Sequence, residues 1–122
     1  MIAKLLVLHF LADFLLQPRE MATKKSIDPH WLFAHLVIQF GVFCVVGWKF
    51  ALANAAIHGV IDWNIWRLYK LSVAKRFPEF NWKDPKQAST YDYWNDSWFY
   101  HTIGLDQLLH GLTLVLLAGA LL

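Results

Sequence analysis

The sequence predicts an all-α integral membrane protein, a four-helix bundle with a long surface loop between the third and fourth helices. The chain of 122 residues is 57% hydrophobic and only 16% charged, whereas a soluble domain has about 25% charged residues. Apolar residues gather in four runs, and most charges lie between them. Because about 100–200 residues make one domain, residues 1–122 are expected to form a single membrane domain.

The overall charge argues against a nucleic-acid partner, and the cysteine content excludes disulfide and cysteine-based zinc sites within the chain. The formal net charge is only +2, so we expect no nucleic-acid partner. The single cysteine, Cys44, lies inside an apolar run. It cannot form a disulfide framework or a cysteine-based zinc site within the chain.

The first helix is expected over residues 2–17. Its apolar run ends before Pro18 and is shorter than the roughly 20 residues that span a bilayer. A cleaved signal peptide is the alternative. His9 and Asp13 inside the run, with no small-residue cleavage pattern after it, favour a retained helix.

The second helix is expected over residues 30–47, because Asp28-Pro29 is a helix-start signal. Trp31 and Trp48 are separated by 17 residues, or about 25 Å along a helix. That separation is typical of aromatic residues at the two interfaces of a membrane.

The third and fourth helices are expected over residues 49–71 and 102–122. Residues 72–101 contain Pro78, Pro85, many charges and three tryptophans. This composition predicts an interfacial loop at the membrane surface, with short amphipathic helices at most.

Lysine and arginine predict the orientation in the membrane. Nine of them fall in or beside the two long loops, and only Lys4 and Lys49 fall on the other side. Cytoplasmic loops carry the excess of positive charge. We therefore expect a multi-pass protein of the inner (cytoplasmic) membrane, with the long loops in the cytoplasm and both termini outside.

Each apolar run carries histidine or aspartate, in three runs as a pair four residues apart, which places the pair on one helix face. By position, all of them fall in the cytoplasmic half of the membrane. The seven residues are His9, Asp13, His35, His58, Asp62, Asp106 and His110.

Three unpaired aspartates inside a membrane would cost roughly 9 kcal/mol. Divalent cations would compensate this cost, and carboxylate with imidazole suits Zn, Mn or Fe. The seven side chains are numerous enough for one or two ions with a bridging carboxylate. A metal-free network of His–Asp hydrogen bonds between helices is the alternative.

Further polar residues are expected to support this site. Four amides are candidates to orient the ligands or to bond between helices: Gln17, Gln39, Asn54 and Gln107. Four cations at the cytoplasmic face are candidates for phosphate contacts or for membrane anchoring: Lys24, Lys25, Arg67 and Lys70. His30 and His101 are placed in loops and left outside the site.

The motifs together resemble a family of unknown function. His-x-x-x-Asp-Phe-x-x-Gln at residues 9–17, His-x-x-x-Asp at 58–62 and Asp-Gln-x-x-His at 106–110 are similar to those of small multi-pass membrane proteins from bacteria and their phages. The resemblance implies a bacterial or phage membrane protein. It implies no particular reaction, and loop 72–101 is not part of the shared pattern.

The leading functional hypothesis is a metal-dependent hydrolase that acts from the cytoplasmic leaflet on a lipid-linked or phosphorylated substrate. Its catalytic residues would be Asp13, Asp62 and Asp106. The first alternative is a divalent-cation transporter, which would need a homo-oligomer because four short helices are few for alternating access. The second is a non-enzymatic membrane interaction protein with a structural polar network. A redox di-iron enzyme ranks below hydrolysis.

Overall fold

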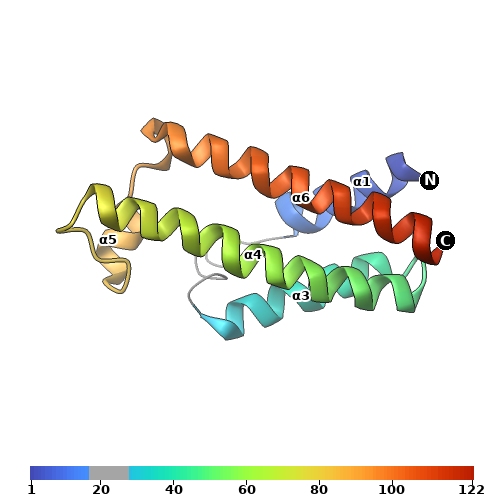
Figure 1. Cartoon of the computed structure of the whole chain (residues 1–122). Coiled ribbons are helices and arrows are strands. Elements are labelled where there is room, and N and C mark those ends of the chain that lie inside the picture. The colour runs from blue at the N-terminus through green and yellow to red at the C-terminus, as the bar shows by residue number, and fades with distance from the viewer. Residues whose placement is uncertain (17–27) are drawn as a thin grey trace.

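A computed structural model describes residues 1–16 and 28–122, and these residues contain helices and no strand. The all-α class predicted from the sequence is therefore confirmed (Figure 1). The elements in chain order are α1 (Ile2–Phe10), η1 (Leu11–Leu15), α3 (Pro29–Phe43), α4 (Trp48–Arg76), α5 (Pro85–Thr90), η2 (Tyr93–Asn95) and α6 (Ser97–Leu121).

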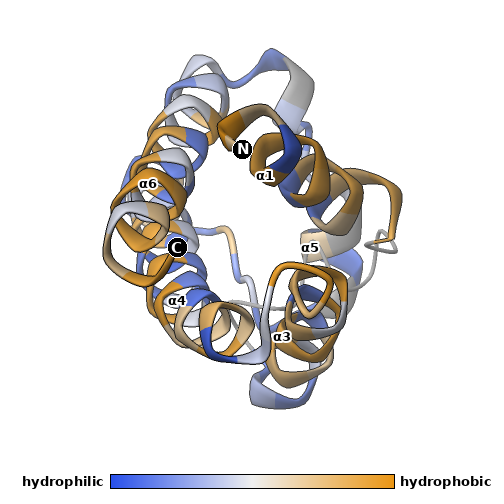
Figure 2. Cartoon of the chain, turned by 90° about the vertical axis from the view of Figure 1, so that its right-hand side faces the viewer, coloured by the Kyte–Doolittle hydropathy of each residue, from blue (hydrophilic) through white to orange (hydrophobic). Residues whose placement is uncertain are grey.

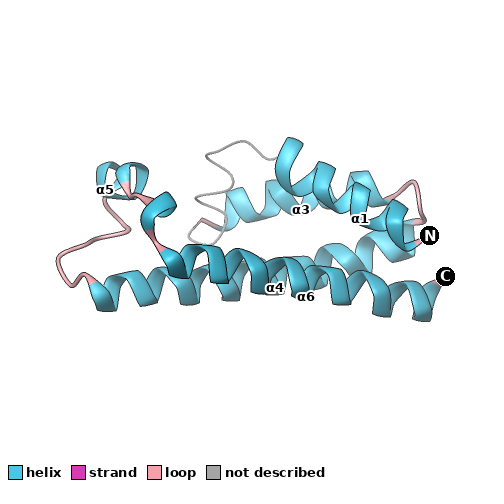
Figure 3. Ribbon diagram, turned by 90° about the horizontal axis from the view of Figure 1, so that it is seen from above, coloured by secondary structure: helices cyan, strands magenta, loops and turns pink. Residues whose placement is uncertain are grey.

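Four helical segments surround a common interior. Helix α4 packs against both α3 and α6, and α1 packs against α3 and α6. The end-on view shows the resulting ring of helices (Figure 2). Both termini and the α3–α4 turn lie at one end of the molecule, and α5 lies at the other end (Figures 1 and 3). This arrangement matches the order of helices expected from the sequence.

The helix starts follow local signals in the sequence. The Asp28 carboxylate accepts a hydrogen bond from the His30 backbone N–H, and Pro29 occupies the first turn of α3, as the Asp-Pro signal predicts. Gly47 precedes α4 with a φ of 156°, which glycine adopts without a Cβ penalty. Asp96 caps α6 by accepting from the Trp98 backbone N–H at 3.0 Å.

The predicted boundaries of loop 72–101 are wrong at both ends. Helix α4 continues to Arg76 and α6 begins at Ser97, so the connection is shorter than predicted and contains α5 and η2. Helix α4 ends just before Pro78, whose ring disfavours a helical conformation in the preceding residue. The charges of residues 72–76 are compatible with a helix that extends beyond the apolar run.

Polar and apolar residues occupy unusual places in this fold. A small apolar core of Leu5, Phe43, Phe50, Ala51 and Leu114 lies toward the end that holds the termini. The interior also holds many buried histidine, aspartate and amide side chains. Large apolar side chains on all four helical segments are exposed, among them Phe14, Phe33, Val60 and Leu116.

Among the described helices, only α6 is long and apolar enough to cross a membrane by itself. Helix α3 has 15 residues, fewer than the roughly 20 that a span requires. Helix α4 has 29 residues, but it carries buried polar groups and several cations.

Asp96 connects α4, the α5–η2 segment and α6. Its carboxylate accepts from Arg76 Nη1 and Nη2 at 3.0 and 2.9 Å, from Tyr69 Oη at 2.7 Å and from Tyr91 Oη at 2.8 Å. The Arg76 guanidinium, together with the two hydroxyls, holds the pKa of Asp96 well below its usual range despite its burial.

We expect an Asp96→Asn variant to lose about 2 kcal/mol or more of folding free energy at pH 7, because it leaves Arg76 without its anionic partner. The pKa of Asp96 is lowered in the folded state. Its ionised carboxylate therefore contributes fully to folding stability above about pH 4, and this contribution declines below that pH. Unfolding of the detergent-solubilised protein should therefore differ between variant and wild type at pH 7, and less at lower pH. Asp92→Asn, at an exposed site, is the control. Equal stability of Asp96→Asn and wild type at pH 7 would contradict the role of this cluster.

Candidate metal centre

The seven histidine and aspartate side chains predicted to form a site lie together in the interior. They come from α1 and η1 (His9, Asp13), α3 (His35), α4 (His58, Asp62) and α6 (Asp106, His110). All are buried, and none is more than 4% exposed. The helix faces predicted to converge therefore do so.

Three pairs are formed within single chain segments, as the four-residue spacing requires. The N–O separations are 3.3 Å for His9–Asp13, 3.0 Å for His58–Asp62 and 3.2 Å for Asp106–His110. Asp13 lies in η1, a wider π-helical turn closed by a Leu16 N–H to Leu11 O bond of 2.9 Å. Such turns are often found at functional sites, and the sequence pattern did not predict this one.

The first donor group joins His35 of α3 and His58 of α4 to the carboxylates of Asp13 and Asp62. His35 Nε2 and His58 Nε2 lie 2.9 Å apart. Asp13 Oδ1 lies 3.3 Å from each of these nitrogens. Asp62 Oδ2 lies 3.1 Å from His35 Nε2 and 3.0 Å from His58 Nε2.

The second donor group lies beside the first and uses the other oxygen of each of these two carboxylates. Asp13 Oδ2 lies 3.3 Å from His9 Nε2. Asp62 Oδ1 lies 3.2 Å from His110 Nε2, which is also 3.2 Å from Asp106 Oδ1. The His58 and His110 rings stack with centroids 3.8 Å apart, so the two groups are in direct contact.

These distances suit a divalent cation. A metal bonded at about 2.0–2.2 Å to nitrogen and oxygen holds neighbouring donors about 3 Å apart. Three sets of buried residues can hold a metal ion: His9, Asp13 and His58; His35, His58 and Asp62; and Asp13, Asp106 and His110. Imidazole with carboxylate and no thiolate is a donor set suited to Zn, Mn or Fe.

Hydrogen bonds alone account poorly for the same arrangement. His58 Nε2 lies within 3.3 Å of Asp13 Oδ1, Asp62 Oδ2 and His35 Nε2, yet an imidazole nitrogen carries at most one proton. His35 Nε2 is likewise within 3.3 Å of Asp13 Oδ1 and Asp62 Oδ2, and its third close neighbour is His58 Nε2. The crowding of acceptors around these nitrogens favours a cation over a metal-free network.

Two of the predicted supporting amides contact the cluster. Gln39 Nε2 donates to Asp13 Oδ1 at 2.7 Å. Gln107 Oε1 lies 3.0 Å from His9 Nε2, and its Nε2 donates to Asp106 Oδ2 at 3.2 Å. Asn54 is buried one turn before His58, and its Nδ2 has no hydrogen-bond partner among the described residues. Gln17 lies outside the described residues.

Of the predicted phosphate contacts, the two that the structure describes, Arg67 and Lys70, are not brought to the cluster. Lys70 is buried two turns beyond Asp62, about 12 Å along the helix axis, and its Nζ lies 5.6 Å from the Trp82 ring centroid. Arg67 is exposed and lies over the Trp63 ring at 4.8 Å. Lys24 and Lys25 lie outside the described residues.

His30 and His101 were predicted in loops, and this placement is wrong. His30 lies in the first turn of α3 and His101 lies in α6. Both side chains are exposed, as expected of residues outside the site. The structural cluster around Asp96 was also missed, although Asp96-Ser97 is a helix-start signal like Asp28-Pro29.

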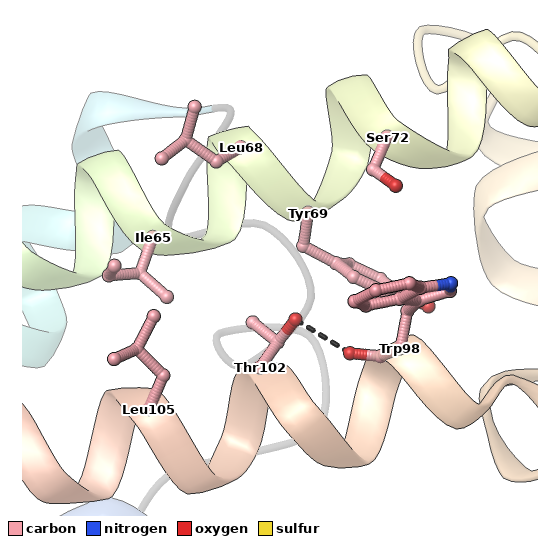
Figure 4. A pocket seen from close by; sticks show the side chains of 7 residues that line it. All are labelled: Ile65, Leu68, Tyr69, Ser72, Trp98, Thr102 and Leu105. Atoms are coloured by element: carbon pink, nitrogen blue, oxygen red, sulfur yellow. Dashed lines mark hydrogen bonds between the residues drawn. The ribbon is translucent and has the colours of Figure 1, made fainter.

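A shallow groove of about 180 Å³ lies between α4 and α6, away from the cluster (Figure 4). Its lining is Ile65, Leu68, Tyr69, Ser72, Trp98, Thr102 and Leu105. The Thr102 hydroxyl donates to the Trp98 carbonyl at 2.7 Å. None of the seven histidine and aspartate residues lines this apolar groove, so the concentration of reactive groups and the surface hollow are separate features.

Comparison with curated proteins and with solved structures finds no match to this chain. A family model matches it over residues 1–121, which include all seven residues of the cluster. The sequence motifs predicted membership of a family of unknown function, and the match confirms it. The chain belongs to the family described as "Protein of unknown function (DUF3307)".

Proposed function

We propose that the protein is a membrane-embedded, metal-dependent hydrolase that acts from the cytoplasmic leaflet on a lipid-linked or phosphorylated substrate. One observation carries the proposal: four histidines and three aspartates from four helical segments lie buried together, with donor atoms about 3 Å apart. Intramembrane ionisable residues are costly and mark functional sites.

The distribution of polarity supports a membrane environment. The interior holds ionisable groups, whereas large apolar side chains such as Phe14, Phe33 and Val60 are exposed. In water, exposed apolar surface of this kind marks a contact with another apolar phase or partner. In a bilayer the same surface faces lipid, and the helices satisfy their backbone polar groups internally.

The geometry along α4 supports a site in the cytoplasmic half of the bilayer. Asp62 is 14 residues beyond Trp48, or about 21 Å along the axis. A hydrocarbon core of about 30 Å that begins near Trp48 would therefore end about 9 Å beyond Asp62. The 29-residue helix then extends past the core, and its lysines and arginines after Asp62 lie at the end assigned to the cytoplasm.

A divalent cation in such a site lowers the pKa of a bound water and stabilises charge on a leaving group. Within the chain, Asp13 and Asp62 contact several histidines each, so we assign them to holding the cation. Asp106 contacts His110 and Gln107, and we assign it to accepting a proton from water. The apolar exterior excludes bulk water from the helix interfaces.

The position of the site indicates the substrate class. A buried centre near the cytoplasmic leaflet can be reached by a lipid headgroup or by a phosphorylated molecule from the cytoplasm. Arg67 lies on the exposed side of α4 beyond Asp62, where it can contact anionic lipid or phosphate. The membrane lipids are accordingly the expected partners.

The test begins with metal analysis of the protein purified in detergent. We expect bound Zn, Mn or Fe, and metal-dependent release of phosphate from phospholipids or from phosphorylated substrates. No bound metal, with unchanged helical content in a His58→Ala, Asp106→Ala double variant, would overturn the proposal. Metal with cation flux in liposomes and no hydrolysis would instead establish the transporter. An iron signal with colour would favour the redox alternative.

A Gln39→Leu variant is expected to bind metal about 10–100-fold more weakly, because Gln39 is the buried amide that donates to Asp13 Oδ1. Metal titration of the chelator-stripped protein gives the dissociation constant. Asn64→Ala is the matched control, since Asn64 is exposed and bonds only to the Val60 carbonyl in the described contacts. Equal affinity of Gln39→Leu and wild type would show that this amide does not orient Asp13.

A further inference from the structure

We infer that the cluster binds two divalent cations side by side, bridged by the carboxylates of Asp13 and Asp62. The inference rests on the proposed metal site and specifies its ligands and stoichiometry. It follows from the way in which the two oxygens of each carboxylate are directed.

In each bridging carboxylate, one oxygen faces two histidines and the other oxygen faces a third. Asp62 Oδ2 lies at 3.1 and 3.0 Å from His35 and His58, while Asp62 Oδ1 lies 3.2 Å from His110. Asp13 Oδ1 lies 3.3 Å from His35 and His58, while Asp13 Oδ2 lies 3.3 Å from His9. A carboxylate that serves one ion would have no need for histidines at both oxygens.

The donors therefore divide into two equivalent sets. The first ion would take His35, His58, Asp13 Oδ1 and Asp62 Oδ2. The second ion would take His9, His110, Asp13 Oδ2 and Asp62 Oδ1. Each set has two imidazoles and two carboxylate oxygens, and bridged ions of this kind lie about 3.5–4 Å apart.

The helix spacing explains why Asp13 and Asp62 are the bridges. Each lies four residues after a histidine of a different set, His9 for Asp13 and His58 for Asp62. Each also reaches a histidine on another helix. Asp106, by contrast, contacts a single histidine, His110, so it borders the second ion only.

The charge of a cluster with two ions determines what else it would bind. Three carboxylates contribute three negative charges, and a buried site penalises any net charge that remains. Two dications leave one positive charge. A single anionic ligand, such as a phosphate oxygen of the substrate, then neutralises the site. The two-ion arrangement thus makes the site selective for anionic groups.

Metal counting tests the stoichiometry. The full chain, purified in detergent, stripped with chelator and dialysed against Mn²⁺, is expected to hold two ions. His35→Ala and His110→Ala should each hold one ion, because each removes a ligand of a single set. Asp62→Asn should hold fewer than one tightly bound ion, because it removes an anionic bridge from both. His101→Ala is the control, because His101 is exposed, and this variant should still hold two ions.

Electron paramagnetic resonance of the Mn²⁺-loaded wild type gives a second readout that needs no variant to fold. Two bridged ions should give an exchange-coupled signal in place of the six-line spectrum of an isolated ion. One ion per chain with an isolated spectrum would overturn the two-ion inference and leave the metal site intact. No ion in the wild type would overturn both the inference and the proposed function. Two uncoupled ions would refute the carboxylate bridges.

Discussion

A His58→Ala variant is expected to lose hydrolytic turnover by about 10³-fold or more, since a metal centre contributes several kcal/mol to the transition state. His58 Nε2 lies within 3.3 Å of His35, Asp13 and Asp62. Its imidazole also stacks on His110 at 3.8 Å. Removing it takes a donor from the first group and a packing surface from the second.

The comparison variant for this prediction is His101→Ala, which removes an exposed histidine of α6 and should leave turnover unchanged. The assay follows phosphate release by the detergent-solubilised protein at a fixed metal concentration. Circular dichroism and size-exclusion chromatography of both variants establish that the helices are retained. Wild-type turnover in a folded His58→Ala protein would exclude the cluster as the catalytic centre.

The cluster could be predicted from the sequence because helix periodicity places residues i and i+4 on one face. This rule relates His9 to Asp13, His58 to Asp62 and Asp106 to His110, and each pair is close in the structure. On α3 the residue at this spacing from His35 is Gln39, an amide. The shared helix face and the position near the cytoplasmic end predicted His35 as a member of the cluster, and it lies between Asp13 and Asp62.

The pairing of donors between helices could not be predicted in the same way. Which oxygen of Asp62 faces His110 depends on the rotation and separation of α4 and α6. The hydropathy pattern of the sequence gives no information on either quantity. The π-helical turn that carries Asp13 is likewise set by packing. A pattern of four-residue steps predicts which residues form the site, but it does not predict which of their atoms contact one another.

The limits of the surface connection were mispredicted for a different reason. Charges in residues 72–76 end an apolar run, but they do not end a helix, because lysine and arginine are good helix formers. Arg76 remains helical and pairs with Asp96. This long-range contact and the Tyr69 and Tyr91 hydroxyls hold Asp96 at the start of α6. The helix-start signal at Asp96 is local, but no local pattern reveals its partners on α4.

The two ends of the molecule are expected to lie on opposite sides of the membrane, which cysteine labelling can measure. The chain has one cysteine, so a Cys44→Ala background allows single new sites. Lys49→Cys places a thiol at the start of α4, at the end that holds both termini. Glu79→Cys places one between α4 and α5, at the opposite end. Both positions are exposed.

A membrane-impermeant maleimide added to intact spheroplasts is expected to label Lys49→Cys and to spare Glu79→Cys until the cells are lysed. The reason is the distribution of cations: nine of the eleven lysines and arginines lie in or beside the two connections assigned to the cytoplasm. Labelling of both sites in intact cells would contradict a membrane-spanning arrangement. The reverse pattern would keep the spanning helices but place the metal centre near the outer leaflet, so that its substrate would come from outside the cell.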